Sequence, residues 1–253
     1  MSDHQSKQTN RISLLSNYQS LIKFCYFISL ILLAACGENK NESNPEEKKS
    51  SEEQSKTPDD QEKETVTDKK TILIFGDSIT AGYGLDDTAD AYPGILQDKI
   101  DSLGLNYTVV NSGLSGETTA GGKSRISWVL KQDVDIFILE LGANDGLRGV
   151  ALSETKSNLQ SIIDRVSDKS PDTRIVLAGM QLPPNMGQDY TAEFRQLFAD
   201  LANENSIEFI PFILKDVGGI EELNQNDGIH PNVEGHQIVA ENVWEVLKPM
   251  IVN

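Results

Sequence analysis

Short apolar runs alternate with amphipathic stretches over residues 71–253, and this alternation constrains the fold more than any other feature. Five runs have the composition of strands that are buried on both faces. They are 71–75, 107–110, 135–139, 174–178 and 207–210. Apolar residues at helical spacing occupy 90–103, 153–166, 191–205 and 233–250. The alternation predicts an α/β domain of three layers, in which helices cover both faces of a doubly wound, five-stranded parallel sheet.

The first 35 residues have the layout of a secretory signal. A polar segment with three basic side chains precedes an uncharged apolar run at 24–35. This run is shorter than the roughly 20 residues that a membrane-spanning helix needs, and it ends in small residues. Residues 1–35 are therefore predicted to be a signal peptide.

The end of this segment, Leu33-Ala34-Ala35-Cys36-Gly37, is similar to the lipobox of bacterial lipoproteins. The resemblance implies cleavage before Cys36 and lipidation of Cys36, and several acyl chains on one residue anchor a protein stably. It also implies an extracytoplasmic place in a bacterial cell envelope, on the periplasmic side of the outer membrane if the cell is Gram-negative. The alternative is an ordinary signal peptide, or a buried helix, whose cysteine falls there by chance.

Residues 36–70 have the composition of a tether. After Cys36 they hold eleven acidic and seven basic side chains and a single aliphatic residue, Val66. Such a segment buries too little apolar surface to fold, so we expect a disordered acidic tether, with a binding tail as the alternative. The remaining 183 residues, 71–253, are enough for one domain with its own core.

Charge and cysteine content exclude several classes of function. The formal net charge is −17, of which −15 falls on 71–253, and so acidic a surface repels nucleic acid. Cys25 and Cys36 both precede the domain, which therefore has no disulfide framework and no thiolate metal site. Histidines and carboxylates show no metal-ligand spacing, and no phosphate-binding glycine loop is present. We expect a monomer that uses neither a metal nor a cofactor.

Polar blocks follow the predicted strands at their carboxyl ends, which is where parallel sheets bind ligands. They occupy 76–82, 111–117 and 142–146, and a fourth block, 227–231, precedes the last helix. Together they supply a serine, an aspartate and a histidine on separate loops, which are the components of acyl-transfer catalysis. Taken singly, each has a structural alternative: Ser78 as a helix cap, 144–146 as a turn, and His230 as a surface histidine.

His236, in the last helix, is expected to be structural, and Trp128 and Trp244 are expected to pack in the core.

The four blocks resemble those of the SGNH, or GDSL, hydrolases. The matching sequences are Gly76-Asp77-Ser78, Gly116, Gly142-Ala143-Asn144-Asp145 and Asp227-Gly228-Ile229-His230-Pro231. The similarity covers 71–253 and is closest to the bacterial branch of acyl-CoA thioesterase I, lysophospholipase L1 and arylesterase. It implies the flavodoxin-like version of the predicted fold. Ile79 stands where GDSL has leucine and Ala143 where glycine is frequent, but neither supplies a reacting atom.

The resemblance also implies roles for particular residues. Ser78 is the expected nucleophile, His230 the general base and Asp227 the carboxylate that orients it. The expected oxyanion donors are the backbone N–H groups of Ser78 and Gly116 and the side-chain amide of Asn144. Gly113 is an alternative to Gly116 in the second block.

The substrate is predicted more coarsely than the chemistry. By resemblance, Leu182 and Pro183 border the acyl-binding cleft, and Pro184, Asn185, Met186 and Tyr190 continue it. An apolar cleft there favours lipid or aryl esters, with thioesters possible in chemistry but acyl-CoA disfavoured outside the cytoplasm. Two alternatives are a carbohydrate O-acetyl esterase and a surface lipoprotein that binds a glycan or lipid without turnover.

Overall fold

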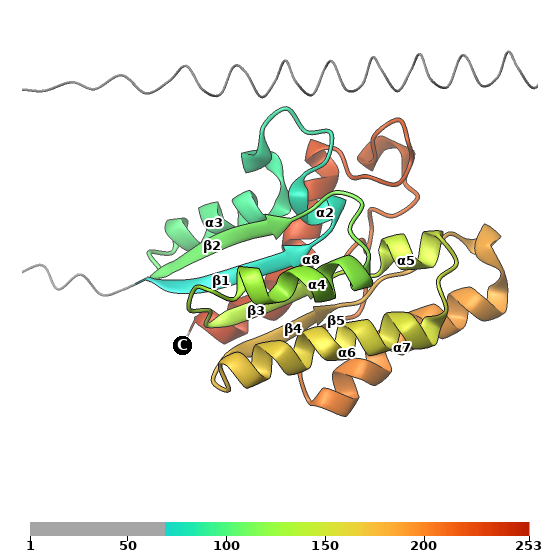
Figure 1. The fold of residues 1–253 in the computed structure, drawn as a ribbon. Coiled ribbons are helices and arrows are strands. Elements are labelled where there is room, and N and C mark those ends of the chain that lie inside the picture. The colour runs from blue at the N-terminus through green and yellow to red at the C-terminus, as the bar shows by residue number, and fades with distance from the viewer. Residues whose placement is uncertain (1–68, 253) are drawn as a thin grey trace, which may run out of the picture. The chain divides into compact units, whose positions relative to one another are not determined.

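A five-stranded parallel sheet lies at the centre of residues 69–252, the part of the chain that the computed structural model describes (Figure 1). The strand order is β2-β1-β3-β4-β5, and every neighbouring pair is parallel. The strands are β1 (Lys70–Gly76), β2 (Tyr107–Gly113), β3 (Ile136–Glu140), β4 (Arg174–Ala178) and β5 (Glu208–Ile210). The signal peptide at 1–35, Cys36 and the tether up to residue 68 were predicted for residues that lie outside the described part.

Helices cover both faces of the sheet, which confirms the predicted three-layer α/β/α architecture (Figure 1). On one face α3 (Tyr92–Ser102) packs against α8 (Val233–Ile251). On the other face α6 (Leu152–Lys169) packs between α4 (Thr119–Val129) and α7 (Gln188–Asn205). None of the helices between residues 69 and 252 is long and apolar enough to cross a membrane.

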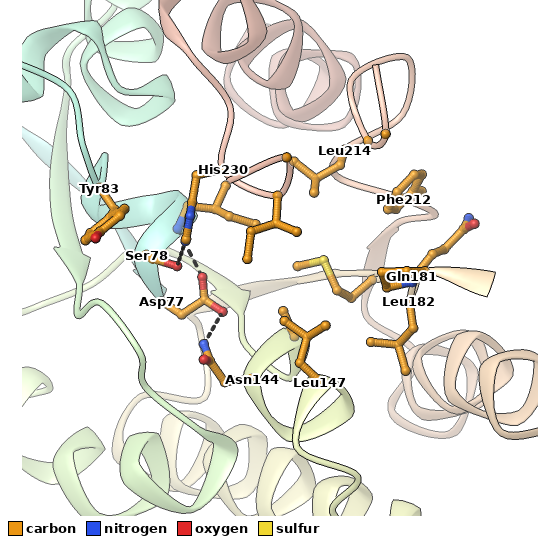
Figure 2. Close-up of a pocket in the computed structure, with 18 of the residues that line it drawn as sticks. Asp77, Ser78, Tyr83, Asn144, Leu147, Gln181, Leu182, Phe212, Leu214 and His230 are labelled. Carbon is orange, nitrogen blue, oxygen red and sulfur yellow. Dashed lines mark hydrogen bonds between the residues drawn. The ribbon is translucent and has the colours of Figure 1, made fainter. Parts of the chain in front are cut away.

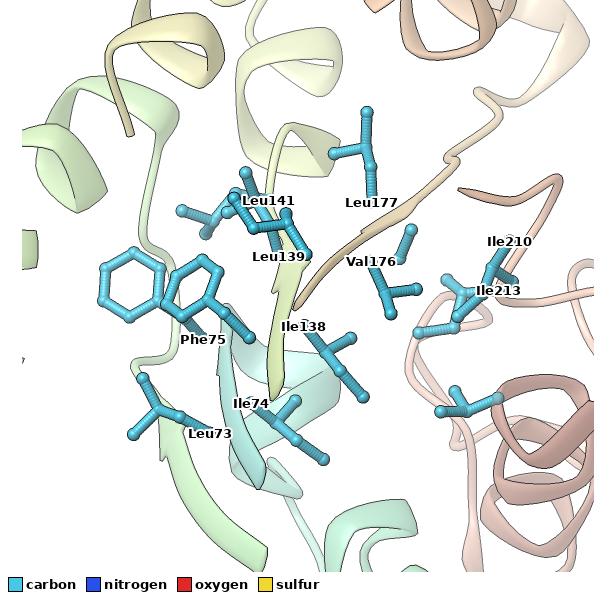
Figure 3. Packing of buried hydrophobic residues seen from close by; sticks show 14 of the residues in the cluster. Leu73, Ile74, Phe75, Ile138, Leu139, Leu141, Val176, Leu177, Ile210 and Ile213 are labelled. Carbon is cyan, nitrogen blue, oxygen red and sulfur yellow. The ribbon is translucent and has the colours of Figure 1, made fainter. Parts of the chain in front are cut away.

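The central strands β1 and β3 are buried along almost their whole length. Side chains from both faces of the sheet contribute to a continuous core, part of which Figure 3 shows around Leu73, Phe75, Ile138 and Leu139. Strands with helices on both sides bury successive side chains in opposite layers, so both sets are apolar. This is why the apolar runs in the sequence were continuous rather than alternating.

The helix α4 was absent from the sequence prediction. Its buried residues are Thr119, Gly122, Ile126 and Val129, which give it too weak an apolar stripe to be recognised. A Cβ at Gly122 would overlap Leu141 Cδ1, so the helix lies directly on the residues that follow β3. Trp128, expected in the core, is 67% exposed on this helix, whereas Trp244 packs partly buried against the core.

Short elements follow the carboxyl ends of the strands and carry the polar blocks. The helix α2 (Ser78–Ala81) follows β1, and α5 (Ala143–Leu147) follows β3. Three 3₁₀ turns are η1 (Thr88–Asp90), η2 (Pro184–Met186) and η3 (Glu221–Leu223). These elements place the blocks at one edge of the sheet, as doubly wound folds do.

Candidate active site

Ser78 is the first residue of α2, at the turn that follows β1. Asp77, not Ser78, caps this helix, because its Oδ1 accepts a hydrogen bond of 3.0 Å from the N–H of Ile79. The structural alternative for Ser78 is therefore wrong. The Ser78 hydroxyl does not cap the helix and contacts His230 instead, with Ser78 Oγ 2.9 Å from His230 Nε2.

Asp227 and His230 lie on one tight loop before α8. His230 Nδ1 is 2.7 Å from Asp227 Oδ2, while Asp227 Oδ1 accepts the N–H groups of Ile229 and His230. Gly228 allows this turn because its φ is +74°, a conformation that favours glycine. An antiparallel bridge between Asn224 and Pro231 closes the loop.

Hydrogen bonding keeps Asp227 ionised. Desolvation opposes the charge, but the bonds from the His230 ring and from two backbone N–H groups outweigh it and lower the pKa of Asp227 to about 2. The carboxylate therefore stays negative at any ordinary pH. It holds the proton of the imidazole on Nδ1 and leaves Nε2 free to accept from Ser78.

Asn144 and Gly116 both line the cavity beside Ser78. The amide Nδ2 of Asn144 donates to Asp77 Oδ2 at 3.1 Å, as Figure 2 shows, and its second hydrogen remains for another acceptor. Gly113 has a different task, because a Cβ there would overlap the backbone of Ala81 in α2. The geometry thus favours Gly116 over Gly113 for the second block.

A buried acid lies beneath the serine turn. Glu140, at the end of β3, accepts from Asp77 N at 3.1 Å and from Thr80 Oγ1 at 2.6 Å, so it holds the residues on both sides of Ser78. Thr80 in turn shares a hydrogen bond of 2.7 Å with the hydroxyl of Tyr92. Glu140 is fully buried, and its Oε1 has no partner among the described residues.

Burial raises the pKa of both acids. Desolvation, with the neighbouring charge of Asp77, raises the pKa of Glu140 well above its usual value. Desolvation also raises the pKa of Asp77 to about 6, against the opposing bonds from Ile79 and Asn144. Sequence reasoning missed Glu140, although an acid at the end of an otherwise apolar strand was a visible signal.

Asp145 connects the third block to α4. Its carboxylate is buried and accepts from both the N–H and the hydroxyl of Thr119, the first residue of that helix, at 2.8 and 2.5 Å. Residues 144–146 are therefore more than a turn. They tie the loop that contains Gly116 to the segment that contains Asn144.

The cavity beside Ser78 has a volume of about 470 Å³ and a mainly apolar lining (Figure 2). Leu182, Pro183 and Pro184 line it. Asn185, Met186 and Tyr190 are not among its lining residues, and the Tyr190 hydroxyl donates to Val150 O at 2.8 Å. The wall is completed by residues that sequence reasoning missed, among them Met180, Leu147, Phe212 and Leu214.

His236 is structural, as expected. It is buried in α8, and its Nδ1 accepts the N–H of Tyr92 at 3.2 Å. Burial lowers the pKa of His236 to about 4, so the ring is neutral at pH 7. Across residues 69–252, no three His, Cys, Asp or Glu side chains gather in a way that could hold a metal ion.

Comparison with known proteins agrees with this geometry. Residues 74–238 match the GDSL-like lipase/acylhydrolase family. Esterase TesA of Pseudomonas aeruginosa is 38% identical over 183 residues, which are 72% of this chain and 90% of that protein. Thioesterase 1/protease 1/lysophospholipase L1 of Escherichia coli K12 is 36% identical over 182 residues, 72% of this chain and 85% of that protein.

A solved structure shows that the likeness extends to three dimensions. The psychrotrophic esterase EstA of Pseudoalteromonas, in a form inhibited by monoethylphosphonate, superposes with a TM-score of 0.68 at 30% identity. The match covers 73% of this chain and all of the EstA chain. The order of the blocks, the sheet and these likenesses agree, and the chain therefore belongs to the GDSL-like lipase/acylhydrolase family and is a carboxylic ester hydrolase.

Proposed function

We propose that Ser78, His230 and Asp227 form the catalytic triad of this esterase. The observation that carries the proposal is the continuous chain of contacts, 2.9 Å from Ser78 Oγ to His230 Nε2 and 2.7 Å from His230 Nδ1 to Asp227, at the wall of the apolar cavity. Hydrogen-bond reach between nucleophile and base, and between base and carboxylate, is the geometry that nucleophilic catalysis needs.

The reaction follows from these contacts. His230 Nε2 accepts the hydroxyl proton as Ser78 Oγ attacks the ester carbonyl carbon, and Asp227 stabilises the imidazolium that results. The carbonyl oxygen becomes an oxyanion, which would accept from the N–H groups of Ser78 and Gly116 and from Asn144 Nδ2. His230 then gives its proton to the leaving alcohol. Water repeats the cycle on the acyl-enzyme and releases the acid.

We infer that the acyl group is apolar. The walls of the cavity come from leucine, isoleucine, methionine, proline and phenylalanine side chains, which stabilise a hydrocarbon or aryl group better than a sugar. This supports lipid and aryl esters, and it weighs against the O-acetyl sugar alternative. Thioester and lysophospholipid hydrolysis are named for the Escherichia coli relative, and the same cavity could accept such acyl groups.

The test is hydrolysis of p-nitrophenyl esters from acetate to palmitate by the full chain and by Ser78→Ala. We expect turnover that peaks at medium or longer chains and vanishes in the variant, with the fold retained by circular dichroism. A fluorophosphonate probe should label the wild-type protein on Ser78 alone. Undiminished turnover in Ser78→Ala would exclude Ser78 as nucleophile, and turnover confined to acetate would favour the sugar deacetylase.

We further propose that Cys36 is lipidated and anchors the enzyme in the cell envelope of a bacterium. The support is the lipobox-like sequence 33–37 and the acidic, apolar-poor segment up to residue 70. Cys36→Ser should move the protein from the membrane to the soluble fraction of the expressing cells. Persistence of the variant in the membrane fraction would show that acylation is not the anchor.

A further inference from the structure

Arg148 contacts both of the elements that we place in the oxyanion hole. It is the residue that ends α5, and its Nη2 donates to the carbonyl oxygen of Gly116 at 3.2 Å and to Asn144 Oδ1 at 3.3 Å. Gly116 comes from the loop after β2, whereas Asn144 comes from α5 after β3. A single guanidinium nitrogen thus connects two segments that the reaction requires at one place.

The contact fixes which way the Asn144 amide faces. Its oxygen accepts from Arg148, and one hydrogen of its nitrogen goes to the buried carboxylate of Asp77 at 3.1 Å. Rotating the amide by half a turn would set NH₂ against the guanidinium and oxygen against the carboxylate, and both contacts would be repulsive. The remaining N–H is therefore held as a donor beside Ser78.

The same side chain restrains Gly116. This glycine has a φ of +79° on a loop with little packing around it. Chain neighbours apart, the one heavy atom of the described residues within 4 Å of a Cβ at Gly116 would be Arg148 Nη2, at 3.9 Å. The backbone of residue 116 thus has freedom that the bond from Arg148 to its carbonyl reduces.

We propose that Arg148 is a positioning residue that pre-organises the oxyanion hole by holding Gly116 and Asn144 together. The inference rests on the proposed function, since it assumes that both groups stabilise the oxyanion. Donors that are already oriented cost no reorganisation during the reaction, and their contribution appears only in the transition state. Arg148 should therefore influence kcat and leave substrate binding almost unchanged.

The experiment is a double-mutant cycle on the full chain with p-nitrophenyl butyrate. Arg148→Met keeps most of the side-chain length but has no donor. Because removal of a whole oxyanion donor costs about 10²–10³-fold in kcat, loss of its orientation is expected to cost about 10-fold, with KM within about twofold. In the Asn144→Ala background, Arg148→Met should lower kcat by less than about threefold, because only the contact of Arg148 with Gly116 remains to be lost.

Two further variants complete the design. Arg165→Met removes an exposed arginine from α6, far along the chain from these blocks, and should leave kcat and thermal melting unchanged. Arg148→Lys keeps a positive charge and a hydrogen-bond donor, and both bonds of Arg148 come from one nitrogen, so this variant should recover part of the kcat that Arg148→Met loses. A kcat in Arg148→Lys as low as in Arg148→Met would show that a cationic donor here does not support the site, and would overturn the positioning role.

The outcomes separate this inference from the proposed function. If Asn144→Ala lowers kcat but Arg148→Met has the same effect with and without Asn144, Arg148 does not act through the amide and only the inference fails. If Asn144→Ala leaves kcat unchanged, the proposed oxyanion hole fails as well. If Arg148→Met raises KM only for ester substrates whose alcohol part carries a negative charge, and leaves kcat unchanged, then Arg148 contacts the substrate headgroup and the inference is overturned.

Discussion

At the scale of single residues, Asp77 shows how one side chain can organise a reactive neighbour. It is adjacent to Ser78, caps α2 through Ile79 and accepts from Asn144. The family pattern includes Asp77 by position, but its task follows from contacts between segments 67 residues apart in the chain. Glu140 holds the same turn from the neighbouring strand. The turn that contains Ser78 is thus held by two buried acids that take no part in the proposed proton transfers.

The contact between Asp227 and His230 predicts how Asp227→Asn will affect kcat. In Asp227→Asn, the amide oxygen can still accept the N–H groups of Ile229 and His230, so the loop should keep its shape. The amide nitrogen would then face His230 Nδ1 as a donor and force the imidazole proton onto Nε2, where it cannot accept from Ser78. We expect kcat to fall by about 10³–10⁴-fold, in line with tautomer-trapped triads.

Single-turnover kinetics and thermal melting would test this prediction. The melting temperature should change little, because the backbone contacts of residue 227 persist. Because the pKa of Asp227 is lowered to about 2, its titration should not contribute to the wild-type pH–rate profile above pH 4. Asp227→Asn with full activity would show that the carboxylate is dispensable.

At the scale of elements, α4 shows how glycine can serve packing rather than flexibility. Gly121 and Gly122 are neighbours on this helix, yet only Gly122 is buried against the core. A Cβ at Gly122 would overlap Leu141 Cδ1, whereas at Gly121 its nearest contact would be Glu117 Cγ at 3.3 Å. Two adjacent positions with the same residue are therefore expected to respond differently to alanine.

Gly122→Ala and Gly121→Ala form a matched pair for this expectation. Gly122→Ala should reduce the free energy of unfolding by about 1–3 kcal/mol, because the helix must shift away from the sheet. Gly121→Ala should be neutral or stabilise by up to about 1 kcal/mol through helix propensity. Urea denaturation of both variants would measure the difference. Equal effects would mean that the close contact of α4 with Leu141 is not maintained in solution.

At the scale of the whole molecule, the sequence predicted the layers and the place of the site but not its walls. All five strands and four helices were predictable, because buried parallel strands and amphipathic helices leave strong periodic signals. The helix α4 and the wall residues Phe212 and Leu214 were not, since a glycine-rich face and a folded-back loop leave no such signal. Asp227 and His230 could be paired in advance because they are only three positions apart in the chain, whereas the contact of Glu140 with Thr80 depends on β1 and β3 being neighbours.

The pH dependence of folding is a whole-molecule property with a sign that follows from His236. Its pKa is about 4 when folded and about 6.5 when unfolded, so the unfolded chain binds more protons between these values. Stability from this group is present above pH 6.5 and is lost as the pH falls toward 4, by up to about 3 kcal/mol. Asp77, whose pKa is raised to about 6, acts oppositely, since its contribution decreases as the pH rises from about 4 to 6.

His236→Gln separates the two contributions. Glutamine cannot titrate, and its oxygen could still accept the N–H of Tyr92, so the variant should lose less stability than wild type between pH 6.5 and 4. Asp77 and Glu140 are present in both proteins and cancel in the difference. Chemical denaturation at several pH values would give that difference. Parallel stability curves for the two proteins would show that His236 is not kept neutral by the fold.

The closed loop of Asp227 and His230 has a consequence for how activity can be lost. His230 and Asp227 are expected to move as one unit. The Asn224–Pro231 bridge and the bond from Gln225 N to His230 O at 2.8 Å close the loop that contains both residues. Asn144 forms a second unit with Asp77, the residue before Ser78, and with Arg148, which also donates to Gly116. The 2.9 Å hydrogen bond between Ser78 Oγ and His230 Nε2 thus joins two units, each of which is held together by its own contacts. A small displacement of one unit relative to the other would break this hydrogen bond and abolish activity, while the contacts within each unit and the surrounding fold stayed intact.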